Sequence, residues 1–481
     1  MRKFTLSSEN IFYIILGAML LFLITRQAIV SPITHDEVNT IDLSQRSVWD
    51  IVTYTDPVPN NHILNTLLLK AGIAVFGDSP LTDRLFNILF FIPFFIFAVL
   101  ISKLLFNELW IRLAFVLMIS LQPYLLDFFG VTRGYGISVA LEMVSLYYFF
   151  LRLKSSEFRP LVLSVIFAAL AVYANFTLMN YFIPLVFLLA FHSVMLHGKT
   201  QKKLIQKDIF LLLAVSVALV MLCYLPFTRM IGTNQFVYWG STGFFTDTVK
   251  PLIISLRSGT EYFGWSHEKV SGIVTDIVIL VFLSGLILIR YQKEKKYFLY
   301  SGVLLLSVIV YNHLQFYVLD IPFLNARTAL FFIPLVVLFM GFCLQAVWHK
   351  NMTLSLVMSM FLSILAVQHF IRGFNVKSPY EWGYDETTYD VLNEMNDIVN
   401  REQIPKPVKV NCHWIFYPSL SYHIKYQYAD VFELVPYHKD IQAESDARFY
   451  YTEAQELEKL SAKFEPVKDY GWRSRFLLKS K

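Results

Sequence analysis

Apolar stretches of about twenty residues recur along most of this chain and constrain its fold more than any other feature. Each is long enough to cross roughly 30 Å of hydrocarbon as an α-helix. They lack the alternation of apolar and polar residues that marks a barrel strand, so we expect helices. About eleven spans are predicted, near residues 11–30, 82–102, 109–127, 135–152, 160–175, 177–197, 209–228, 271–290, 298–317, 328–348 and 353–371.

Composition supports an α-helical integral membrane protein. Of the 481 residues, 56% are hydrophobic and 16% are charged, whereas about a quarter of an ordinary soluble domain is charged. The first apolar stretch follows a basic N-terminus and resembles a secretory signal. Its far end carries Arg26, Pro32 and acidic residues rather than a small-residue cleavage site, so we expect it to be a retained first span.

Basic residues predict the orientation of the chain. They gather in five short loops, near residues 103, 152–159, 199–207, 290–296 and 350, all on the predicted side of the N-terminus. Because short cytoplasmic loops are rich in lysine and arginine, we expect a cytoplasmic N-terminus and an extracytoplasmic C-terminal tail. The net charge of +5 then reflects membrane topology, and no compact basic and aromatic patch predicts a nucleic-acid partner.

The predicted outer side holds three large segments: residues 31–81, residues 229–270 and the tail. In the first, apolar residues recur at helical spacing on both sides of Asp56-Pro57-Val58-Pro59, which predicts helices lying in the membrane interface. We expect a polytopic membrane domain over residues 1–371. Residues 372–481 are mixed in charge and contain no span, so they predict a small soluble α/β domain.

Three polar residues, His35, Asp36 and Glu37, directly follow the first span. Adjacent acids at a membrane surface are costly unless they are hydrated, paired or used. One carboxylate could act as a general base that deprotonates an acceptor. Alternatively, both acids cap the following helix and interact with its dipole.

Further polar residues lie on the same predicted side: Asn61, His62, Arg84, Arg133, Tyr135 and Arg327. Arginines at a membrane boundary can grip a phosphate or pyrophosphate bidentately. The alternative is simple anchoring of the helices by lipid headgroups.

Metal ligands could also come from this region, from His35, Asp36, Glu37 and His62. Two histidines on separate helices do not define a metal site, so a divalent metal is possible and no cofactor is required.

Several short motifs occur in a characteristic order. They are Thr34-His35-Asp36-Glu37, Asn61-His62, Phe76-Gly77-Asp78-Ser79 followed by Arg84-Leu85, Arg133-Gly134-Tyr135-Gly136, and Asn325-Ala326-Arg327 before an aromatic span. In this order, and on one side of the membrane, they resemble the GT-C membrane glycosyltransferases. Within that class the chain most resembles the bacterial relatives of protein O-mannosyltransferases and of the lipid A aminoarabinose transferase. The likeness covers about residues 10–350.

This resemblance implies a multi-pass protein of the bacterial cytoplasmic membrane that transfers a hexosyl or pentosyl group, with inversion, from a polyprenyl-phosphate donor. The acceptor would be an envelope glycan, a lipid or a protein. Asp36 matches the family's base and Glu37 its acidic neighbour, while Arg133, Arg327 and, less closely, Arg84 match residues that hold the donor phosphate. His35, Asn61, His62 and Tyr135 would bind substrate, although Ile63 follows His62 where the family often has proline.

Two other kinds of protein remain possible: a transporter or lipid flippase, and a membrane scaffold that presents the tail domain. A transporter should carry polar residues at mid-bilayer and broken helices in related halves. Glu142 and Asp276 lie inside predicted spans, and for Glu142 we expect a packing or hydrogen-bonded role. Otherwise polarity concentrates in the outer loops, which favours an enzyme acting there.

Overall fold

The computed structural model describes residues 7–198, 201–233, 235, 240–262, 264–471 and 475–481. Within them, nine helices are long and apolar enough to cross a membrane. They are α1 (Ser8–Val30), α5 (Pro80–Leu105), α8 (Gly134–Lys154), α10 (Met179–His197), α11 (Lys202–Gly232), α13 (His267–Leu288), α14 (Lys295–Leu319), α15 (Phe332–Lys350) and α16 (Met352–Gly373). The other two predicted spans are shorter helices, α6 (Leu109–Ser120) with α7 (Pro123–Asp127), and α9 (Phe158–Ala174). The predicted helical membrane architecture is confirmed.

The basic loops meet at one end of the bundle. Arg112 forms an ion pair with Glu9, at the start of α1, with Nε and Oε1 2.8 Å apart. Arg152 pairs with Asp208, and the Lys296 ammonium donates to the Leu153 carbonyl. These contacts join the loops after α8, α10 and α13 to one another, and the chain after α5 to the start of α1, the opposite end of α1 from residues 31–81.

That first outer segment contains three helices: α2 (His35–Ser44), α3 (Val48–Thr53) and α4 (Ile63–Phe76). The sequence predicted two helical pieces, and the first of them is divided. Ser47 starts α3 as its N-cap by accepting a hydrogen bond from the Asp50 amide, and Tyr54 ends it in the left-handed conformation. The second large outer segment holds α12 (Lys250–Leu256).

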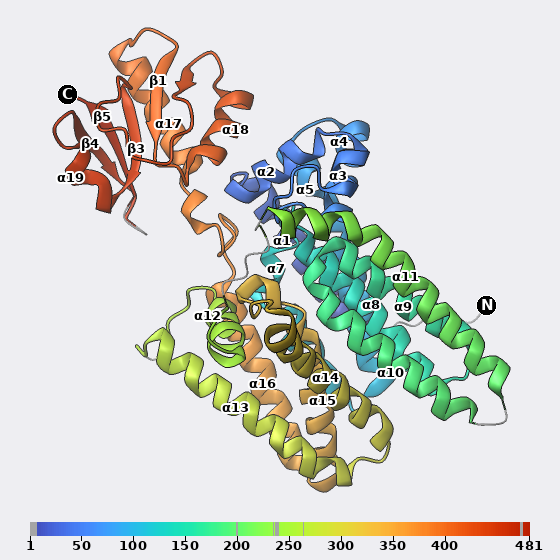
Figure 1. Cartoon of the computed structure of the whole chain (residues 1–481). Helices are drawn as coiled ribbons and strands as arrows, with labels where there is room; N and C mark the ends of the chain where they lie inside the picture. Colours follow the sequence, from blue (N-terminus) through green and yellow to red (C-terminus); the bar gives the residue numbers. More distant parts are fainter. Residues whose placement is uncertain (1–6, 199–200, 234, 236–239, 263, 472–474) are drawn as a thin grey trace, which may run out of the picture.

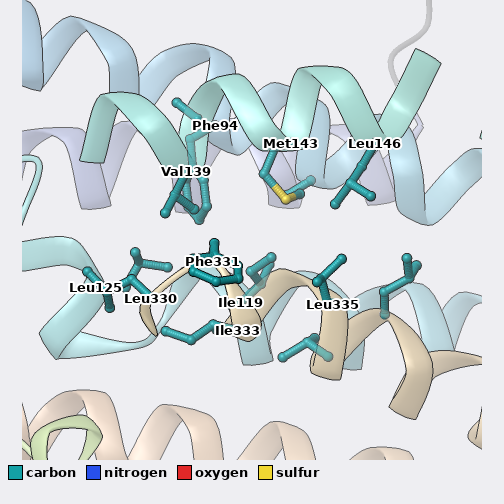
Figure 2. Close-up of a cluster of buried hydrophobic side chains, with 14 of the residues drawn as sticks. Phe94, Ile119, Leu125, Val139, Met143, Leu146, Leu330, Phe331, Ile333 and Leu335 are labelled. Atoms are coloured by element: carbon teal, nitrogen blue, oxygen red, sulfur yellow. The ribbon is translucent and has the colours of Figure 1, made fainter. Parts of the chain in front are cut away.

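A buried apolar layer joins α8 to the start of α15. Figure 2 shows Val139 and Met143 of α8 pointing toward Phe331 and Leu335, and all four belong to one core cluster. Arg133 is the N-cap of α8. The short helix η4 (Ala326–Ala329) ends two residues before Phe331. This packing therefore brings the start of α8 and the segment before α15 together.

The tail folds into a five-stranded sheet in the order β2-β1-β3-β5-β4. The strands are β1 (Val408–Cys412), β2 (Phe432–Leu434), β3 (Phe449–Glu453), β4 (Phe464–Asp469) and β5 (Arg475–Ser480), with helices α17 (Thr388–Glu402), α18 (Tyr417–Gln427) and the short α19 (Leu457–Leu460). β1 is parallel to β2 and β3, whereas β5 is antiparallel to β3 and β4. A core of its own, with Val391, Val410 and Phe449, supports the predicted small α/β domain.

The tail domain docks on the same end of the bundle as α2 (Figure 1). The Ile33 amide donates to Nε2 of His423 at 3.0 Å, and the Ser419 hydroxyl donates to the Ile33 carbonyl at 2.7 Å. The His35 amide donates to Asp385 at 2.8 Å. The chain leaving α1 is thus held between the membrane helices and the tail domain.

Candidate active site

A cavity of about 700 Å³ opens at this end of the bundle. Six of the residues singled out from the sequence line it: Asp36, Asn61, His62, Arg133, Tyr135 and Arg327. They come from α2, the start of α4, the start of α8 and η4. Segments separated by almost three hundred residues therefore converge on one site.

Asp36 lies between two guanidinium groups. Its Oδ2 atom is 3.3 Å from a terminal nitrogen of Arg327 and 3.9 Å from one of Arg133. The indole of Trp382 also lies near enough to favour the charged form of the carboxylate. Burial by itself raises the pKa of Asp36, but the charges of Arg133 and Arg327 outweigh it, so the pKa is lowered below the ordinary aspartate value. Asp36 is consequently an anion at neutral pH.

Arg133 is almost fully buried, with 1% of its surface exposed. One terminal nitrogen donates to the Thr40 hydroxyl at 3.0 Å and to the Asn60 carbonyl at 3.1 Å. Its Nε has no partner among the described residues. A buried, unpartnered N–H on a cation that lines a cavity is a ready donor for an anionic ligand.

Arg327 is held by two residues, Glu381 and Trp382, that are not among the site residues predicted from the sequence. Glu381 accepts from it at 3.0 Å and also accepts from the Tyr124 hydroxyl at 2.7 Å. Trp382 lies under the guanidinium, with its ring centroid 5.4 Å away. Both residues belong to the connection between α16 and the tail domain, which carries no recognisable motif, so only the folded chain brings them to Asp36.

His62 is buried against Tyr135, with ring centroids 4.8 Å apart. Its Nδ1 donates to the Ala174 carbonyl at 3.1 Å, and its Nε2 has no partner within the part of the chain that the structure describes. Burial, followed by the charge of Arg133, lowers the pKa of His62 well below its usual range. The ring is therefore neutral, and Nε2 is a hydrogen-bond acceptor at the cavity wall.

Asn61 lines the cavity but its amide is used to shape the loop. The amide nitrogen donates to the Ile51 carbonyl at 2.9 Å, and the amide oxygen accepts from the Thr66 hydroxyl at 3.0 Å. Tyr135 packs its ring beside Arg133, whose guanidinium carbon is 5.9 Å from the ring centroid. Of the two, Tyr135 has the side chain better suited to contact a ligand.

Glu37 and Arg84 are not brought to the cavity. Both side chains are fully buried and form a two-point ion pair, at 2.7 and 2.6 Å. Glu37 also accepts from the amides of Thr34 and Thr132 at 2.9 and 2.8 Å. The remaining N–H groups of Arg84 donate to the chain at the end of α1, at Ala28, Ser31 and Pro32.

This placement does not fit a catalytic role for Glu37 or a phosphate-binding role for Arg84. Adjacent residues point to different sides of a helix, so Asp36 faces the cavity while Glu37 faces the core. The pattern Thr34-x-x-Glu37 is a capping box at the start of α2. That signal in the sequence identifies Glu37 as a structural residue.

No family model matches the sequence, and no curated protein matches it. Among solved structures, two of ArnT from Cupriavidus metallidurans resemble the chain. The apo structure has a TM-score of 0.52 at 10% identity, and the structure bound to undecaprenyl phosphate has a TM-score of 0.53 at 11% identity. In both cases the match covers 97% of each chain. The chain has the fold of ArnT. The predicted resemblance to the GT-C class is thus confirmed for the fold, and at this level of identity for the fold alone.

Within this ArnT fold, the described residues contain no group of three or more His, Cys, Asp and Glu side chains placed to hold a metal ion. His35 is turned away from the other candidate ligands, because its Nδ1 donates to the Ile415 carbonyl at 2.9 Å in the tail domain. The side chains of His35, Asp36, Glu37 and His62 therefore do not form a shared metal site.

Glu142 lies in α8, fully buried, and neither carboxylate oxygen has a hydrogen-bond partner among the described residues. Of the two expected roles, packing or hydrogen bonding, the described residues give Glu142 only the first; the hydroxyls of Ser145 and Tyr181 bond to each other at 2.9 Å. Glu142 is not among the residues that line the cavity around Asp36. The residue is therefore separate from the site around Asp36.

Proposed function

We propose that this chain is a membrane glycosyltransferase that takes a sugar from a polyprenyl-phosphate donor in the cavity around Asp36. The observation that carries the proposal is the placement of one carboxylate within 3.3 and 3.9 Å of two guanidinium groups in a single cavity. The full-length likeness to ArnT, one structure of which is bound to undecaprenyl phosphate, supports this donor class.

In this proposal Arg133 and Arg327 bind the donor phosphate. When the anomeric C–O bond breaks, its electron pair goes to the phosphate oxygen, and the two fixed cations stabilise the charge that develops there. Both arginines line the cavity, and 30% of the Arg327 side chain is exposed, so both are placed to contact a ligand there.

Asp36 acts as the general base. The acceptor oxygen attacks the anomeric carbon as the phosphate leaves, and the acceptor proton passes to the Asp36 carboxylate. Binding of the phosphate draws Arg133 and Arg327 away from Asp36, which frees the carboxylate for the acceptor. Direct displacement inverts the anomeric centre.

The test uses purified protein in lipid nanodiscs with a panel of undecaprenyl-phosphate sugars. Released undecaprenyl phosphate and glycosylated product are both measured. Formation of product from at least one donor supports the proposal. Movement of the intact donor across a bilayer, with no cleavage of any donor, would instead identify a flippase.

Loss of the Arg327 guanidinium should weaken donor use strongly. A hydrogen bond to a charged group contributes about 1.5–3 kcal/mol, so Arg327→Gln should lower kcat/KM for the donor roughly tenfold to a hundredfold. Arg46→Gln is the matched control, because Arg46 pairs with Asp56 at the exposed surface. Equal kinetics in the two variants would remove Arg327 from the phosphate site.

The same substitution should change the pH profile. Asp36 has a lowered pKa, so the native enzyme should keep its kcat/KM down to about pH 4, the ordinary aspartate pKa. Arg327→Gln removes one of the two cations that favour the charged carboxylate, so the pKa of Asp36 rises and the acid limb moves to higher pH. If the acid limb of kcat/KM in Arg327→Gln lies at the native pH or at lower pH, Asp36 is not the titrating base.

A further inference from the structure

A second cavity, of about 330 Å³, lies between α2 and the tail domain. Its membrane-domain wall is formed by His35, Asn39 and Asp42 of α2. Positions 35, 39 and 42 follow helical spacing, so these side chains share one face of α2. The opposite wall comes from the tail domain, from the segment around Trp414 to Ser421 and from the chain that follows β2.

The two cavities meet at Asn39, which lines both. Asp36 lies three residues earlier on the same helix and faces the first cavity. A molecule held in the second cavity therefore lies about one turn of α2 from the proposed base. The tail domain thus forms one wall of a cavity next to Asp36.

Aromatic rings dominate the wall supplied by the tail domain. Trp414 contacts His35 edge to face, with centroids 6.1 Å apart, and Tyr417 contacts Tyr437 edge to face, with centroids 5.3 Å apart. Tyr437 is 51% exposed and stands at the open side. Such rings present a rigid apolar face beside a polar edge.

Hydrogen-bonding groups in this cavity are left without partners. Asn39, Asp42 and Ser421 form no side-chain hydrogen bond with another described residue. Because Nδ1 of His35 bonds to the Ile415 carbonyl, Nε2 is the ring nitrogen left for a ligand. Apolar rings combined with a few convergent polar groups are typical of a small-molecule site.

The walls are fixed in position. The Ile33 amide donates to His423, and the Ser419 hydroxyl donates to the Ile33 carbonyl, so α18 is tied to the chain that enters α2. Tyr422 of α18 also donates to Asp83, at 3.1 Å. A preformed site loses less conformational freedom on binding than a mobile one.

We propose that this second cavity, defined by His35, Asn39, Asp42, Trp414, Ser421 and Tyr437, binds a carbohydrate unit of the acceptor. This inference rests on the proposed function. A sugar ring has an apolar face for Trp414 and Tyr437 and hydroxyl groups for Asn39, Asp42 and Ser421. No arginine or lysine is among the described residues that line it, in contrast to the donor cavity, so a phosphate-rich acceptor group fits poorly. The acceptor is accordingly a glycan that reaches Asp36 from the tail domain.

Binding is tested directly, without turnover. The full chain in nanodiscs is mixed with cellohexaose, chitohexaose or mannohexaose, and saturation-transfer NMR reads contact with the sugar ring protons. At least one oligomer should bind the native protein. Tyr437→Ala and Trp414→Ala should each weaken that binding at least tenfold, whereas Trp265→Ala, which removes a partly exposed tryptophan outside both cavities, should not.

Tyr437 is half exposed, so its substitution keeps the test valid even if Trp414→Ala fails to fold. Three results would overturn the proposal. They are no binding of any of the three oligomers, unchanged binding in Tyr437→Ala, and saturation transfer to a Ser/Thr-rich peptide but not to the sugars. Asp36→Asn should keep oligomer binding while losing transfer. Failure of the acceptor site and failure of the proposed chemistry therefore give different results.

Discussion

Asp36→Asn should reduce sugar transfer by about 10²- to 10⁴-fold, the usual contribution of a positioned general base. Asparagine keeps the size of the side chain and cannot take the acceptor proton. The KM for the donor should not rise, because Arg133 and Arg327 lose a competing anion that now lies 3.9 and 3.3 Å from them. The measurement is product formation from an undecaprenyl-phosphate sugar under saturating donor.

The matched control for this variant is Asp56→Asn. Asp56 is also an outer-segment carboxylate paired with an arginine, Arg46, but it does not line the cavity. Its substitution should leave transfer within about twofold of native, because exposed ion pairs contribute little. A kcat for Asp36→Asn equal to that of the control would refute the role of Asp36.

Glu37→Gln should destabilise the folded protein severely. Removing one partner of a fully buried ion pair leaves the other charge uncompensated, at a cost of about 3–5 kcal/mol. Here the charge left behind is Arg84, which ties the end of α1 to α5 through Ala28, Ser31 and Pro32. Thermal unfolding in nanodiscs, followed by tryptophan fluorescence, should show a clearly lower midpoint and a smaller folded fraction.

Asp56→Asn again serves as the comparison, because the Arg46–Asp56 pair is solvent-exposed and should contribute about 0–1 kcal/mol. The folded fraction of Glu37→Gln that survives should retain measurable transfer, since Glu37 does not touch the cavity. If Glu37→Gln had native stability but no transfer activity, Glu37 would instead have a catalytic role.

The membrane architecture could be predicted because a long apolar segment in hydrocarbon must hydrogen bond its own backbone, and a helix of about twenty residues does so while spanning the bilayer. The positions of the short basic loops were then sufficient to group Asp36, Arg133 and Arg327 on the opposite side of the membrane. Contacts such as Arg112 with Glu9 and Lys296 with Leu153 agree with a common end for those loops. The orientation of this end toward the cytoplasm stays a prediction.

The individual roles of neighbouring residues were harder to predict. Asp36 and Glu37 are adjacent and chemically alike, and only their positions on α2 separate a cavity residue from a core residue. The capping box from Thr34 to Glu37 contained that information, but the resemblance to a family motif outweighed it. Arg84 was predicted to bind the donor phosphate because it lies at a predicted membrane boundary. Its actual partner is Glu37, 47 residues earlier, and the sequence alone gives no sign of that pairing.

Glu381 and Trp382 were missed for a different reason. They lie in the connection to a domain that was predicted to be separate, and they reach Arg327 and Asp36 only through tertiary packing. Long-range contacts of this kind have no local signature in one sequence. The same holds for the cavity between α2 and the tail domain, whose walls are contributed by segments almost four hundred residues apart.

The most direct test of the account is a structure of the native chain in nanodiscs with undecaprenyl phosphate. The phosphate should lie in the cavity within hydrogen-bonding distance, about 2.7–2.9 Å, of Arg133 and Arg327. The Asp36 carboxylate should then have lost its contact with at least one of the two guanidiniums. A phosphate bound elsewhere, or Arg133 and Arg327 unchanged around Asp36 with lipid present in excess, would contradict it.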